Sequence, residues 1–130
     1  MTQHLTGGCK CGLVRYSGIL AAFPMIRCHC RDCQQLTGTG HADMMPLDAA
    51  TFQITDACKV FEMTGDTGGR SLSGFCPDCG SQLTRRFDTL SGKVFVHAAS
   101  LDDPTEYTLS RSIFTGSAQP WDHDIIEAKA

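Results

Sequence analysis

Cys76-Pro77-Asp78-Cys79-Gly80 is the stretch that decides the fold, because it places two thiols close together in front of a glycine. Two sulfurs separated by two residues can hold one metal ion, and this spacing is typical of a zinc knuckle. The glycine permits the tight backbone turn that a knuckle needs. The stretch therefore predicts half of a metal site, placed in a turn.

A second pair of cysteines lies near the N-terminus, in residues 7–12 (GGCKCG), with glycines on both sides. Together the two pairs, Cys9, Cys11, Cys76 and Cys79, would complete a tetrahedral four-cysteine zinc site. A closed site of this kind has no vacant coordination position, so we expect a structural zinc that ties the N-terminal segment to a late hairpin. The alternative is that these cysteines are reduced and bind no metal.

The middle of the chain carries a third group, in residues 28–33 (CHCRDC). Cys28, Cys30 and Cys33 can cup one ion from a single loop and leave its fourth position open. That arrangement is typical of catalytic zinc, where water or a substrate atom takes the open position. Because thiolate donors favour a soft incoming ligand, the site suits thiol chemistry. We therefore predict a catalytic zinc at these three cysteines.

Other interpretations of the middle group remain open. His29 could be a fourth ligand that closes the site, although a residue between two ligands generally points elsewhere and a supporting or surface role is expected. The three thiols could also form a redox relay, or bind zinc for structure only. Arg31 is expected to be a solvated loop residue or to hold a carboxylate of a substrate.

Composition bounds the remaining possibilities. The 130 residues fit one domain spanning 1–130, and 11 basic against 14 acidic residues provide no field that would attract nucleic acid. The chain has no apolar run long enough to span a bilayer, and its first residues lack the layout of a signal peptide. We expect a cytoplasmic protein, in which eight clustered cysteines more often bind metal than form disulfides.

Short apolar and β-branched segments separated by glycine, proline and aspartate predict an all-β fold of short antiparallel strands, as a sandwich or an open barrel. A turn or a single helical turn should follow the middle cysteines. Residues 102–109 could instead begin a helix. The expected strands are residues 13–19, 24–27, 41–45, 51–55, 59–64, 70–75, 83–87, 94–98 and 107–114.

A few further residues are candidates for a supporting role. His97 lies in an apolar strand and is expected to be a satisfied core residue. Trp121, with the two residues after it, could wall a pocket or pack over a sheet edge. Cys58 stands alone and is expected to behave as a small buried hydrophobe.

The three cysteine motifs, in this order and spacing, resemble those of the glutathione-dependent formaldehyde-activating enzyme family, also called the centromere-protein-V-like family. The resemblance runs from Gly7 to about Trp121. It implies an Mss4-like β-tent fold with two zinc ions per chain. It also implies that Cys9, Cys11, Cys76 and Cys79 hold the structural zinc, and that Cys28, Cys30 and Cys33 hold the catalytic one.

The resemblance further implies a carbon–sulfur lyase activity in which glutathione and formaldehyde are joined as S-hydroxymethylglutathione. The expected partner is a small thiol such as glutathione or its aldehyde adduct. Gln34 stands where many relatives have a basic residue, which weakens the transfer of anion binding to that position. The alternative function is a non-enzymatic zinc module that binds a protein. A protein side chain as the fourth ligand of the middle cluster would favour this module, whereas an open position would favour the enzyme. The acidic pI opposes association with nucleic acid.

Overall fold

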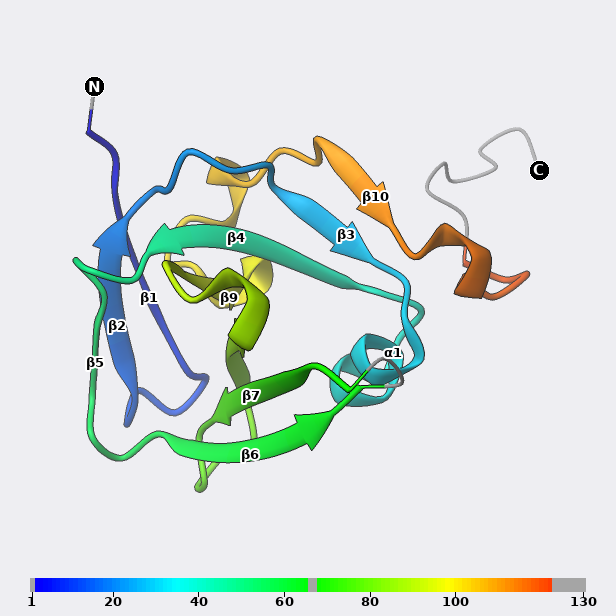
Figure 1. The fold of residues 1–130 in the computed structure, drawn as a ribbon. Helices are drawn as coiled ribbons and strands as arrows, with labels where there is room; N and C mark the ends of the chain where they lie inside the picture. The colour runs from blue at the N-terminus through cyan, green and yellow to red at the C-terminus, as the bar shows by residue number, and fades with distance from the viewer. Residues whose placement is uncertain (1, 66–67, 123–130) are drawn as a thin grey trace.

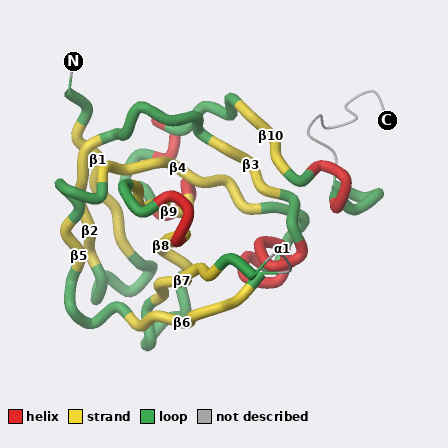
Figure 2. Tube along the Cα trace, viewed as in Figure 1, coloured by secondary structure: helices red, strands yellow, loops and turns green. Residues whose placement is uncertain are grey.

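The structure is a computed structural model, and it describes residues 2–65 and 68–122. Within these ranges the chain forms two β-sheets and a single α-helix (Figures 1 and 2), so the predicted all-β class is confirmed. The helix is α1 (Arg31–Thr37). The strands are β1 (His4–Gly8), β2 (Arg15–Ile19), β3 (Ile26–Cys28), β4 (Ala42–Asp48), β5 (Gln53–Ile54), β6 (Lys59–Thr64), β7 (Arg70–Phe75), β8 (Gln82–Phe87), β9 (Lys93–His97) and β10 (Arg111–Ile113).

The larger sheet has seven strands in the order β10-β3-β4-β9-β8-β7-β6, and the smaller has three in the order β1-β2-β5. The larger sheet is strongly curved, so that in Figure 1 β10, β3 and β4 lie across from β7 and β6. The small sheet stands at one end of this curve and α1 at the other. Two isolated bridges, Gly7 with Leu101 and Leu20 with Leu47, join the small sheet to the rest.

Strand β4 divides the core into two clusters because successive side chains of a strand point to opposite faces. Met45 packs with Leu5, Tyr16 and Val96 in the cluster beside the small sheet. Its neighbour Met44 packs instead in the second cluster, with Ile26, Cys28, Cys33, Ala42 and Phe95. The second cluster thus places two of the middle cysteines among apolar side chains.

All nine expected strands have a counterpart, β6 and β7 with the expected ends and the others with shifted ends, and the remaining differences have local causes. Strand β1 was missed because Leu5 is the one large apolar residue of His4–Gly8. Strand β10 pairs with β3 in parallel, which departs from the expectation of antiparallel strands. The helix alternative for residues 102–109 is wrong: a single 3₁₀ turn, Pro104–Glu106, forms there.

Helix α1 is longer than the single turn that the sequence predicted. Cys30 precedes it in an extended conformation, and its sulfur accepts a hydrogen bond from the backbone N–H of Cys33. Gly38 ends the helix in the left-handed region with φ of 77°. The helix is therefore capped at its start by a residue of the middle cysteine group and at its end by a glycine. None of the helices in the described ranges is long and apolar enough to cross a membrane.

His97 is buried in β9, as the sequence predicted, but it is not fully satisfied. Its side-chain Nε2 has no hydrogen-bond partner among the described residues. Burial, and then the nearby positive charge of Arg85, lower the pKa of His97 to about 4. The ring is therefore neutral at pH 7, and protonating it in the folded state is unfavourable.

We predict that His97 makes the fold less stable as the pH falls below 6.5. An unfolded histidine takes up its proton near pH 6.5, whereas the folded one does so near pH 4, so the unfolded state binds more protons between these values. Between pH 7 and 5.5 the loss due to His97 is about 1 kcal/mol. Urea unfolding of the native protein and of His97→Leu at both pH values measures it. An equal loss in both proteins would show that another group is responsible.

Candidate metal centres

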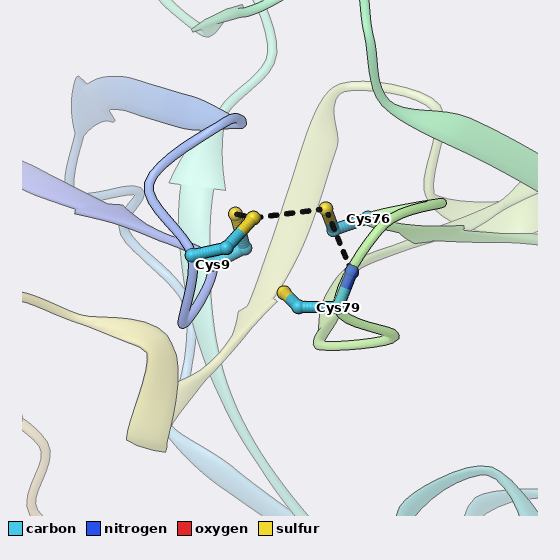
Figure 3. A group of neighbouring side chains, drawn as sticks. Cys9, Cys76 and Cys79 are labelled. Carbon is cyan, nitrogen blue, oxygen red and sulfur yellow. Dashed lines mark hydrogen bonds between the residues drawn. The ribbon is translucent and has the colours of Figure 1, made fainter.

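The two outer cysteine pairs meet where the sheets come together. Cys9 and Cys11 lie in the loop between β1 and β2, and Cys76 and Cys79 lie in the turn between β7 and β8. Figure 3 shows Cys9, Cys76 and Cys79 pointing toward a common centre. All four sulfurs lie within 4.8 Å of one another. The structure therefore brings together the four residues that the sequence assigned to one site.

The spacing of these sulfurs fits a tetrahedral ion. The sulfur atoms are 3.6 Å apart between Cys9 and Cys11 and 3.7 Å apart between Cys11 and Cys76. An ion with metal–sulfur distances near 2.3 Å would place its sulfurs about 3.8 Å apart. The four-cysteine cluster can thus hold a metal ion with little rearrangement.

Backbone N–H groups help to hold these sulfurs in place. Val14 donates to the sulfur of Cys9 at 3.2 Å, and Cys79 donates to the sulfur of Cys76 at 3.5 Å. Gly80 has a φ of 79°, which permits the turn that returns its N–H to the carbonyl of Cys76. The N–H of Val14 lowers the pKa of Cys9 and so favours the thiolate, which is the form that binds a metal.

The middle cysteines form a second cluster at the start of α1. Cys28 ends β3, Cys30 caps the helix, and Cys33 lies in its first turn. Their sulfurs lie within 4.8 Å of one another, and no fourth cysteine, histidine or carboxylate of the described residues joins them. The donor set therefore fits a metal ion with one coordination position open.

The contacts within this cluster favour a thiolate at Cys30. Hydrogen bonds from Cys28, and then from Cys33, lower the pKa of Cys30 to about 2. Contacts with Cys30 and then with Cys33 raise the pKa of Cys28. The cluster therefore favours one ionised sulfur among its three. Arg85 adds a favourable Coulomb interaction with Cys30.

Arg85 is a functional residue that the sequence analysis missed. Its side chain is 2% exposed, and it donates to the sulfur of Cys33 at 3.4 Å and to the hydroxyl of Ser71 at 3.3 Å. No carboxylate of the described residues forms a salt bridge with it. Since a buried guanidinium needs a counter-charge, the cysteine cluster is its partner. The sequence held one signal of its burial: Arg85 lies between Leu83 and Phe87 at alternate positions of an expected strand, so all three side chains point to the same face.

A cavity of about 470 Å³ opens in front of the second cluster. All three cysteines line it, together with Arg85 and the apolar side chains of Phe87, Phe95 and Ile113. This volume is within the range of small-molecule sites, about 300–1,000 Å³. The cluster is therefore accessible to a small ligand.

Other candidate residues lie elsewhere. His29 points away from the sulfurs and lies beside His41, with ring centroids 5.6 Å apart. Arg31 lines the cavity but donates to the side chain of Gln34 at 2.6 Å. Trp121 is 65% exposed and does not line the cavity, and the residue after Asp122 lies outside the described residues. Cys58 packs against the first core cluster, but it is half-buried and not the buried residue that the sequence predicted.

The fold and the clusters define a class: an all-β protein with two groups of cysteines that can hold metal ions. A sequence model of the glutathione-dependent formaldehyde-activating enzyme family matches residues 4–117. The chain belongs to this family, and the predicted resemblance, with its Mss4-like fold, is confirmed.

The fold is also similar to the crystal structure of a Rhodobacter sphaeroides protein, with a TM-score of 0.64 and 18% sequence identity. The alignment covers 82% of this chain and 98% of that chain. At this identity the likeness shows a common fold alone. No curated protein matches the sequence.

We predict that the four-cysteine cluster stabilises the whole fold through its metal. Cys79→Ser should lose one metal ion per chain and lower the free energy of unfolding by about 3 kcal/mol or more, because binding at a structural site is coupled to folding. Elemental analysis and urea unfolding measure the two effects. Cys58→Ser is the control and should keep both the metal content and the stability. A fully stable Cys79→Ser protein would contradict a structural role.

We also predict that Arg85 and the middle cysteines are energetically coupled. Replacing Cys28, Cys30 and Cys33 by alanine leaves Arg85 buried without an anion, which should cost about 3–5 kcal/mol. Arg85→Met should destabilise the native chain but restore at least about 1 kcal/mol in the triple variant. Urea unfolding of all four proteins measures the coupling. Arg86→Met, on the exposed neighbour, should have the same small effect in both backgrounds. An equal effect of Arg85→Met in both would disprove the coupling.

Proposed function

We propose that this protein is a zinc-dependent carbon–sulfur lyase that acts on a small thiol adduct, of the S-(hydroxymethyl)glutathione synthase type. The observation that carries the proposal is the second cluster, where three sulfurs from the junction of β3 and α1 face a cavity with no fourth ligand from the described residues. A closed cluster would have favoured a non-enzymatic module. Membership of the family supports the same activity.

In this proposal the two clusters have different roles, and each holds one zinc ion. Cys9, Cys11, Cys76 and Cys79 form the structural site, since four thiolates fill a tetrahedron. The catalytic site consists of Cys28, Cys30 and Cys33. Thiolate-rich donor sets with tetrahedral spacing favour zinc over harder divalent ions. A zinc ion held by three thiolates supplies a position at which an incoming thiol ionises at neutral pH.

The reaction joins a thiol and an aldehyde. The substrate sulfur forms a bond to the carbonyl carbon, the carbonyl π electrons move to oxygen, and the oxygen takes up the proton that the thiol gave up. The reverse reaction breaks the carbon–sulfur bond and returns the aldehyde. Holding the two reactants side by side in one cavity further accelerates the formation of the carbon–sulfur bond.

The side chains that line the cavity suit it to a small thiol substrate. Phe87, Phe95 and Ile113 provide apolar walls that limit the access of water to the sulfurs. Arg85 offsets the negative charge of the cluster, and its Nε has no partner among the described residues. That N–H can donate to an anionic oxygen of a ligand, which suits a thiol that carries carboxylates, such as glutathione.

We predict that the protein with both sites filled by zinc accelerates the exchange between formaldehyde and S-(hydroxymethyl)glutathione at least tenfold. Exchange NMR with ¹³C-formaldehyde and glutathione measures the rate against the uncatalysed reaction. Cys30→Ser should abolish the acceleration because it removes a cluster ligand. Cys58→Ser is the matched control, since both cysteines are half-buried, and it should retain full activity.

The proposed activity would be disproved by a single result. A protein that holds two zinc ions per chain, yet leaves the exchange rate unchanged with glutathione, cysteine and 2-mercaptoethanol, is not a thiol-adduct lyase of this type.

A further inference from the structure

His29, His41 and Asp122 form a third cluster of metal-binding side chains, separate from the cysteines. Each offers one ligand atom, and these atoms all lie within 4.8 Å of one another. Nδ1 of His29 is 3.1 Å from Oδ2 of Asp122, and Nδ1 of His41 is 2.9 Å from the same oxygen. The three residues are far apart in the sequence, and the fold brings them together behind the loop that holds the second cysteine cluster.

His29 is the first sign that this cluster is built for an ion. Its side chain is 3% exposed, and its Nδ1 has no hydrogen-bond partner among the described residues. The nearby carboxylate oxygen of Asp122 is within ion-pair distance but not in hydrogen-bond geometry. Buried polar atoms are nearly always paired, so an unpaired one needs an explanation such as an ion.

His41 is oriented as metal-binding histidines usually are. Oδ2 of Asp43 lies 3.4 Å from its Nε2, while Nδ1 faces Asp122. A carboxylate on the far ring nitrogen fixes the ring and raises the basicity of the nitrogen that faces the ion. Asp43 is itself held by Arg27 at 2.7 Å and by the hydroxyl of Tyr107 at 3.1 Å.

Gln34 holds the segment that carries Asp122 against α1. Its side-chain amide donates to the carbonyl of His29 at 2.7 Å and to that of Ser117 at 3.0 Å. Gln119 donates back to the oxygen of Gln34 at 3.0 Å. Gln34 is 4% exposed, so this network is part of the interior. The position of Asp122 is therefore fixed by the same helix that carries the second cysteine cluster.

We propose that His29, His41 and Asp122 are the ligands of a third metal site, which takes a divalent transition-metal ion such as Zn²⁺ or Co²⁺. Two imidazoles and one carboxylate form a borderline donor set that suits these ions and leaves a position for water. Tetrahedral ligand atoms at such a site lie about 3.4 Å apart, so an ion needs the cluster to open by only about 0.3–0.5 Å.

The competing possibility is a metal-free network in which His41 donates its Nδ1 proton to Asp122. That network accounts for His41, whose Nδ1 lies 2.9 and 3.0 Å from the two carboxylate oxygens. It leaves Nδ1 of His29 without a hydrogen-bond partner among the described residues, although Oδ2 of Asp122 lies 3.1 Å away. The two possibilities differ in one measurable quantity, the number of metal ions per chain.

The experiment uses the native protein with both cysteine clusters filled with zinc and adds Co²⁺. Cobalt bound to thiolates shows intense sulfur-to-metal charge transfer in the near ultraviolet, whereas cobalt bound to nitrogen and oxygen does not. We expect one further equivalent of Co²⁺ to bind, with weak visible bands and no charge-transfer band. Failure of the native protein to bind a further equivalent would overturn the proposal, and this arm needs no variant.

Variants then assign the ligands. His41→Gln and Asp122→Asn should each weaken binding of the additional cobalt at least tenfold, and His4→Gln, on an exposed histidine, should leave it unchanged. Gly40→Ala keeps every ligand, but its new Cβ would overlap the carboxylate carbon of Asp122, so it should also weaken binding. His29 is left in place because its neighbours are cysteines of the second cluster. Unchanged binding in His41→Gln and Asp122→Asn would overturn the proposal.

This test is independent of the proposed lyase activity. Its readout is the binding of metal at a nitrogen and oxygen site, and it is measured with both cysteine clusters already filled. A protein without lyase activity could still bind the third ion, and an active lyase could fail to bind it.

Discussion

The junction of the two outer cysteine pairs is the constraint on which the rest of the fold depends. Cys9 and Cys76 belong to the first core cluster as well as to the four-cysteine cluster, with 8% and 0% of their surfaces exposed. Four sulfurs this close, some of them facing N–H donors, are stable together when a cation balances their charge. A cation bound there would fasten the small sheet to the turn between β7 and β8, at one end of the curved larger sheet.

The cysteine clusters were predictable from the sequence because their geometry is local. Residues at spacings of one and two positions share a loop wherever that loop lies, so each pair could be recognised without the fold. Arg85 and the parallel pairing of β10 with β3 depend on segments far apart in the chain. A lone buried arginine on a strand signals an anionic partner, but only the fold shows that this partner is the second cysteine cluster.

Alternation along an extended chain explains how residues 28–30 serve two sites. Cys28 ends a strand and Cys30 is extended, with φ of −66° and ψ of 158°, so their sulfurs face the cavity while His29 points to the other side. A histidine between two ligands is therefore directed away from their metal by backbone geometry. The same geometry delivers it to His41 and Asp122, on the far side of the loop.

Arg85 couples folding to the ionisation of the second cysteine cluster. If all three thiols were protonated, its guanidinium would be buried beside neutral groups, which is unfavourable. The folded protein therefore favours thiolates at this cluster before any ion binds. Because a metal must otherwise displace those protons, the arginine strengthens metal binding. An open three-ligand centre can thus gain metal affinity from a buried cation, without a fourth ligand from the described residues.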